Sequence, residues 1–115
     1  MHSNDDGLHW SLPVAVDLGP WTGTLMGPGN GILLGRHSAS VSSGRLMMCG
    51  ASGYVGNMKM RALIWFSDDH GATWVQSNTS DAFMGMGECQ LVELSNGTVV
   101  INMRNENKQV RIVSL

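Results

Sequence analysis

Short apolar runs of about strand length are separated along the chain by clusters of Gly, Asp, Asn and Ser. Such runs, bounded by turn-forming residues, are typical of β-strands, and no helical periodicity of convincing length occurs. The expected strands are Trp10–Val16, Ile32–Arg36, Arg45–Gly50, Met60–Phe66, Trp74–Gln76, Glu88–Leu94, Thr98–Arg104 and Gln109–Val113. The Gly- and Pro-rich stretch Asp17–Gly31 is expected to be a loop. The pattern therefore predicts an all-β fold of antiparallel strands.

The eight residues SDDHGATW form the turn between two of these strands. The side chains of Ser67 and Asp69 can accept hydrogen bonds from nearby backbone N–H groups and close the turn locally. Gly71 can adopt a positive φ without a steric penalty. Thr73 and Trp74 suit the start of a half-buried strand. Strand, turn and strand together predict a hairpin.

This turn has the full pattern Ser-x-Asp-x-Gly-x-Thr-Trp, which resembles the Asp-box repeat of sialidases and related β-propellers. In that family the box lies between the outer strands of a blade, away from the active site, so the resemblance implies a structural role. Ser3–Trp10 has the same spacing, with His9 in the Thr position. The two stretches begin at positions 3 and 67, 64 residues apart, whereas one blade usually has roughly 40–50 residues. Longer loops would account for the difference; the alternative is a chance match in a Gly- and Asp-rich turn.

The resemblance implies about two blades of antiparallel sheet from a six-bladed sialidase-type β-propeller. Residues 1–16 would end one blade, residues 17–76 would form one blade with the Asp box at 67–74, and residues 77–115 would begin the next, with a hairpin at 88–104. Two blades alone would leave both outer sheet faces exposed, because ring closure is what covers them. We therefore expect a fragment that needs the remaining blades to complete its site.

The hairpin at 88–104 has a three-residue loop, Ser95-Asn96-Gly97, with Gly available for the left-handed position. In that register, the numbers of opposed residues add up to 192. The pairs on one face are then Leu94–Thr98, Val92–Val100, Gln90–Asn102 and Glu88–Arg104. A two-residue loop would instead put Glu88 and Arg104 on opposite faces. From the pattern alone, a cross-strand Glu–Arg pair is more often an ordinary surface ion pair than a functional one.

The segment from Gly87 to Arg104 looks like the sialidase hairpin that carries two active-site residues, and it is nearest to lysosomal-type animal sialidases, including the Cys after the Glu. Gly27–Ile32 resembles the family's Gly-Pro-Gly-x-Gly-Ile segment, and Gly44-Arg45-Leu46 and Cys49-Gly50 follow at similar spacing. The resemblance covers roughly residues 20–113.

By this resemblance, Glu88 matches the glutamate that pairs with the nucleophilic tyrosine, and Arg104 matches one of three arginines that bind the substrate carboxylate. The implied reaction is hydrolysis of terminal sialic acid from glycoconjugates, with retention of configuration and without a metal or organic cofactor. The family's other two arginines, its acidic aspartate and its nucleophile have no counterpart here. Tyr54 is the only tyrosine and has a different context. We therefore expect the isolated chain to be inactive.

Composition narrows the classes of partner. The 115 residues carry a formal net charge of −2 and no apolar run near the ~20 residues that span a bilayer, so neither nucleic acid nor a membrane span is indicated. The polar N-terminus is not a signal peptide. No histidine has metal-ligand spacing with a cysteine. Cys49 and Cys89 are expected to be buried free thiols, although they could lie close together on adjacent blades.

Two glycosylation patterns, at Asn78 and Asn96, are compatible with a secretory or lysosomal protein. The resemblance likewise implies a lysosomal or secreted location. The competing hypothesis for function is a non-catalytic Asp-box propeller that binds carbohydrate or protein. A third is a chain that folds alone as an open β-sandwich.

Overall fold

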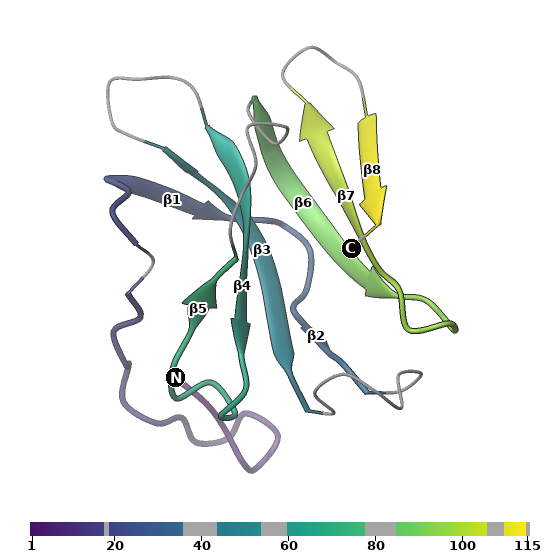
Figure 1. Cartoon of the computed structure of the whole chain (residues 1–115). Helices are drawn as coiled ribbons and strands as arrows, with labels where there is room; N and C mark the ends of the chain where they lie inside the picture. The colour runs from purple at the N-terminus through teal and green to yellow at the C-terminus, as the bar shows by residue number, and fades with distance from the viewer. Residues whose placement is uncertain (18, 36–43, 54–59, 78–84, 106–109, 115) are drawn as a thin grey trace.

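The computed structural model describes residues 1–17, 19–35, 44–53, 60–77, 85–105 and 110–114. Figure 1 shows an all-β chain, and the described residues contain no helix, so none that could cross a membrane. The strands are β1 (Gly23–Met26), β2 (Ile32–Leu33), β3 (Leu46–Gly53), β4 (Arg61–Ser67), β5 (Val75–Gln76), β6 (Met86–Glu93), β7 (Val99–Asn105) and β8 (Val110–Ser114). The predicted all-β class is confirmed.

The strands form two antiparallel sheets, consistent with part of a β-propeller. Sheet A has the order β1-β3-β4-β5, with β2 also paired to β3, and sheet B has the order β6-β7-β8. Strand β1 pairs with residues 50–53 of β3, and β2 pairs with residues 46–47 of the same strand. Together β1 and β2 are therefore one edge of sheet A, interrupted by residues 27–31. The Gly27 N–H still donates to the Cys49 carbonyl, at 3.0 Å, where this interruption begins.

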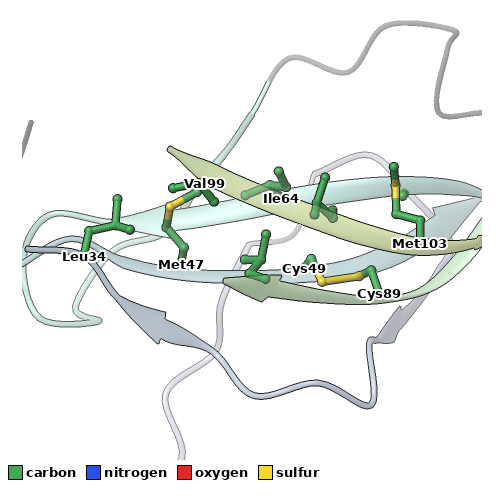
Figure 2. Close-up of a cluster of buried hydrophobic side chains, with 10 residues drawn as sticks. Leu34, Met47, Cys49, Ile64, Cys89, Val99 and Met103 are labelled. Atoms are coloured by element: carbon green, nitrogen blue, oxygen red, sulfur yellow. A yellow bond between two sulfur atoms is a disulfide. The ribbon is translucent and has the colours of Figure 1, made fainter. Parts of the chain in front are cut away.

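The hydrophobic core lies between the two sheets, as Figure 2 shows. Alternate residues of β3 and β4 point toward alternate residues of β6 and β7, as the two-residue period of strands requires. The buried cluster is Leu34, Met47, Cys49, Ala62, Ile64, Cys89, Leu91, Val99, Ile101 and Met103. A disulfide joins Cys49 to Cys89 across the core, with 6.0 Å between their Cα atoms. The expectation of free thiols was wrong, because packing the sheets face to face brings the two cysteines within bonding reach.

Two expected elements differ from the structure. Residues 10–16 form no strand, and the side chains of Leu12 and Val14 are 85% and 63% exposed. Their alternating pattern suits a strand, but a strand needs a partner, and none of the described strands pairs with them. The expected loop Asp17–Gly31 contains β1, because β3 continues to Gly53 and offers β1 a longer edge. The other strands lie within a few residues of their expected bounds, and Arg36 and Gln109 fall outside the described residues.

Only one outer face matches the expected exposure of a two-blade segment. On sheet B, the outward residues Gln90, Val92 and Asn102 are exposed. On sheet A, the face that carries Leu63 and Trp65 is buried, so the expectation was wrong there. Residues before β1 account for part of this cover. They include Trp21, whose indole donates to Gln76, the residue paired with Trp65, and whose ring lies 5.2 Å from the Arg61 guanidinium.

Candidate functional site

The turn between β4 and β5 is closed by its own side chains. The Ser67 hydroxyl accepts from the Gly71 N–H at 2.8 Å and donates to Asp69 at 2.8 Å. The Asp69 carboxylate in turn accepts from the Thr73 backbone N–H at 2.8 Å and from its hydroxyl at 2.6 Å. These bonds, from the Thr73 hydroxyl first, lower the pKa of Asp69 to about 2. His70 and Gly71 have the positive φ values, 57° and 89°, that reverse the chain here.

The N-terminal stretch repeats this turn almost bond for bond. Ser3 accepts from the Gly7 N–H at 2.9 Å and donates to Asp5 at 2.8 Å, and Asp5 accepts from the His9 N–H at 2.9 Å. His9 Nδ1 lies 2.6 Å from Asp5 Oδ2, in the position that the Thr73 hydroxyl has in the β4–β5 turn. Asp6 and Gly7 have φ values of 57° and 86°. The two stretches therefore form the same turn, and the imidazole takes the place of the hydroxyl.

The two acidic residues of the Asp box, Asp68 and Asp69, are both bound by other side chains. Arg45 donates two hydrogen bonds to Asp68, at 2.7 and 2.8 Å, and its guanidinium lies 4.2 Å from the centroid of the Phe66 ring. The hydrogen bond from Arg45 lowers the pKa of Asp68. Asp69 is held by Thr73 and Ser67 as described above. Neither carboxylate is presented as a catalytic group.

The hairpin of β6 and β7 has the register predicted from its loop. Observed pairs include Val92 with Val100 and Gln90 with Asn102, each adding up to 192. The Leu94 N–H donates to Thr98 O at 2.8 Å, and Gly97 closes the loop with a φ of 82°. The register prediction is confirmed from Cys89 to Glu93, and it puts the side chains of Gln90 and Val92 on the face away from the core. The predicted direct pairing of Glu88 with Arg104 falls where the ladder is irregular.

Glu88 and Arg104 meet at the far end of this hairpin. Arg104 Nη1 donates to Glu88 Oε2 at 2.9 Å, and the two side chains are 57% (Glu88) and 73% (Arg104) exposed. The ladder shifts by one residue between Met86 and Cys89, so Glu88 lies in a β-bulge. A bulge re-aims the side chains it contains. An ion pair this exposed contributes little to stability, so the fold alone does not account for its placement.

Beside this pair lies an open groove of about 1090 Å³. Its walls come from β1, the interruption at 27–31, β6 and β7. The lining residues are Leu25, Met26, Pro28, Gly29, Asn30, Ala51, Met60, Gly87, Glu88, Cys89, Gln90, Asn102, Met103, Arg104 and Asn105. Pockets for small organic ligands are typically about 300–1,000 Å³, so the groove is large enough for a sugar.

Sterics explain why positions 27 and 29 of the interruption are glycine. A Cβ on Gly29 would lie 2.8 Å from the Cβ of Gln90, and one on Gly27 would meet the Cys89 backbone. The backbone here passes directly against β6, which only glycine permits. Sequence reasoning noted this motif without its geometry. It missed the groove wall formed by Leu25 and Met26, because the strand that carries them was expected to be a loop.

The structure leaves some sequence candidates undescribed. Tyr54, His37 and Asn78 lie outside the described residues. Within the described ranges, no group of three or more His, Cys, Asp or Glu side chains could hold a metal ion. Of the residues predicted for the site, the structure brings Glu88 and Arg104 together at the groove and keeps the Asp-box residues at the β4–β5 turn.

Two comparisons relate the whole chain to known proteins. The family model described as the BNR repeat-like domain matches residues 1–115. A sialidase from Micromonospora viridifaciens is 32% identical over 109 residues. That alignment covers 90% of this chain and 16% of the relative, so the chain spans a small part of the length of the relative it matches.

Proposed function

Since the chain belongs to the BNR repeat-like domain family, we propose that it is a segment of an exo-α-sialidase, which hydrolyses terminal sialic acid from glycoconjugates. The observation that carries this proposal is the carboxylate–guanidinium pair, Glu88 with Arg104, beside a groove of sugar size. The 32% identity to a bacterial sialidase supports the same reading.

In this proposal Arg104 binds the carboxylate of sialic acid. A guanidinium fits a carboxylate through two parallel hydrogen bonds and stays charged at any working pH. Among the described residues, the Arg104 guanidinium donates from Nη1 to Glu88, and its Nε and Nη2 edge would receive the second carboxylate. Glu88 would then orient the guanidinium that receives the substrate.

Glu88 has a second role in the proposal, as the base for a tyrosine nucleophile. A free phenol has a pKa of about 10 and reacts poorly at neutral pH unless a neighbouring group takes its proton. Sialidases use tyrosine rather than a carboxylate as nucleophile. The physical reason is charge, because the substrate carries an anion at its reacting carbon and would repel a second one. The exposed position of Glu88 leaves it accessible to a side chain from outside this chain.

The tyrosine, the acid and the remaining arginines would come from other blades of the same propeller. We place the blade boundaries at residues 1–16, 17–76 and 77–115, with closest kinship to lysosomal-type animal sialidases. The disulfide between Cys49 and Cys89 supports a secreted or lysosomal location, since such bonds persist in oxidising compartments. Alone, the 115 residues would have no turnover.

The test uses the longer polypeptide that carries this chain and a fluorogenic sialoside. Arg104→Lys keeps the charge but loses the planar fork, so KM is expected to rise by about tenfold or more. Glu88→Gln is expected to lower kcat by about 10²-fold or more, as for loss of a general base. Arg45→Lys is the matched control, because Arg45 binds Asp68 at the Asp-box turn and not the groove.

Two results would contradict the proposal. One is release of the fluorophore by the isolated 115-residue chain. The other is a longer polypeptide whose rate is unchanged by Arg104→Lys and Glu88→Gln. Binding of sialosides without any hydrolysis by the longer polypeptide would favour a carbohydrate-binding module instead.

A further inference from the structure

The disulfide lies next to the candidate catalytic glutamate. Regular pairing of β6 with β7 resumes at Cys89, which lies opposite Met103. Glu88 directly precedes Cys89 and lies in the bulge. Cys89 is 3% exposed and Cys49 is 8% exposed, so the bond is enclosed by the core. It is a covalent cross-link between the two sheets, as the yellow bond in Figure 2 shows.

The ladder does not hold the backbone at Glu88. Met86 pairs with Asn105 and Cys89 pairs with Met103, so two residues of β6 stand opposite Arg104 alone. Bulged residues lack a regular partner, and their position depends on what flanks them. On the C-terminal side, the flanking residue is the disulfide cysteine.

The disulfide also lies under the interrupted edge of sheet A. The Gly27 N–H donates to Cys49 O at 3.0 Å, and the Cβ position of Gly27 is 3.0 Å from Cys89 Sγ. Pro28 and Gly29, which follow at once, line the groove together with Cys89. The disulfide therefore adjoins both the bulge that carries Glu88 and the segment 27–31 that lines the groove beside it.

We propose that the Cys49–Cys89 disulfide is a positioning element that holds Glu88 in place at the groove, so that reduction of this bond impairs the site without unfolding the sheets. This inference rests on the proposed function for its catalytic consequence. The bonded sulfurs are about 2.05 Å apart in any disulfide, whereas non-bonded heavy atoms need about 3.5–4.0 Å. Reduction therefore pushes β3 and β6 apart at this point, while the rest of the buried cluster still packs.

The chemistry is thiol–disulfide exchange with a dithiol reductant. The S–S bond breaks, Cys49 and Cys89 each gain one electron and one proton, and the reductant closes to its own disulfide. Because the bond is enclosed, access is expected from the groove side, where Cys89 contributes to the lining.

The first test is hydrogen exchange, measured by mass spectrometry on the longer polypeptide before and after reduction. Residues 86–90 and 27–31 are expected to exchange at least several-fold faster after reduction, because both adjoin the broken bond. Residues 62–66 of β4 are the internal control and are expected to keep their protection. The double variant Cys49→Ala/Cys89→Ala is expected to match the reduced protein and to ignore the reductant. Unchanged exchange at residues 86–90 after complete reduction would overturn the proposal.

The second test asks whether the bond acts through Glu88. Reduction is expected to lower the kcat/KM of the wild type by about tenfold or more, since misplacement by about 1 Å costs up to about 10²-fold. In a Glu88→Gln background the same treatment is expected to change kcat/KM less than twofold, because the group being positioned is gone. An equal loss in both backgrounds would mean a general structural role and overturn the proposal. Absence of sialoside hydrolysis by the oxidised protein would contradict the proposed function alone, since the exchange result stands without it.

Discussion

Two different side chains close the same turn in this chain. Thr73 uses a hydroxyl and His9 uses an imidazole nitrogen, and both reach the second oxygen of an aspartate four residues earlier, at 2.6 Å. The last-but-one position of the turn therefore requires a hydrogen-bond donor that reaches the aspartate, and not threonine itself. For this reason the N-terminal stretch was recognisable by spacing, although the identity of its closing bond needed the coordinates.

The aspartate of the turn gives the first stability prediction. The pKa of Asp69 is lowered from 3.8 to about 2, so the folded state favours the ionised form. This contribution is fully present above the unfolded value of 3.8 and is lost as the pH falls through about 2. The free energy of unfolding, measured with urea, is expected to fall between pH 4 and pH 2 less steeply in Asp69→Asn than in the wild type. An equal slope in the two proteins would contradict this account.

At the scale of elements, the local sequence pattern predicted most strands, but it did not predict where strand formation depends on a partner distant in sequence. The continuous apolar run of β4 and the register of the β6–β7 hairpin followed from composition and from a three-residue loop. Strand β1, with the sequence GTLM, has no such signal and exists because β3 offers it an edge. Residues 10–16 show the converse, an alternating pattern without a partner among the described strands. The groove wall formed by Leu25 and Met26 could not be predicted, because these residues belong to strand β1.

The close approach of residues 27–31 to β6 gives a second stability prediction. Gly27→Ala would drive a Cβ into the Cys89 backbone, which cannot move without disturbing the disulfide. The expected cost is about 1–3 kcal/mol, as for overpacking. Gly87→Ala is the matched control, because its Cβ would meet nothing within 4 Å. Urea unfolding compares the two, and an equal effect of both variants would contradict the steric account.

At the scale of the whole chain, a shared hydrophobic core and the Cys49–Cys89 disulfide hold the two sheets together. The disulfide closes a loop over a sequence separation of 40 residues. In the chain-entropy model, a loop of this length is worth about 4 kcal/mol, because the bond restricts the unfolded state. Cys49→Ala/Cys89→Ala is therefore expected to lower the free energy of unfolding by about 2–4 kcal/mol. Unfolding of the wild type with and without a reductant checks this value, and a loss below about 1 kcal/mol would contradict it.

The interrupted edge of sheet A both pairs with β3 and lines the groove. β1 and β2 keep the hydrogen bonds to β3, while the residues between them shape the rim of the groove. Backbone proximity restricts positions 27 and 29 to glycine, whereas Pro28 and Asn30 line the groove. If the groove binds a sugar as proposed, substitutions at Pro28 and Asn30 are therefore expected to change which sugar it accepts.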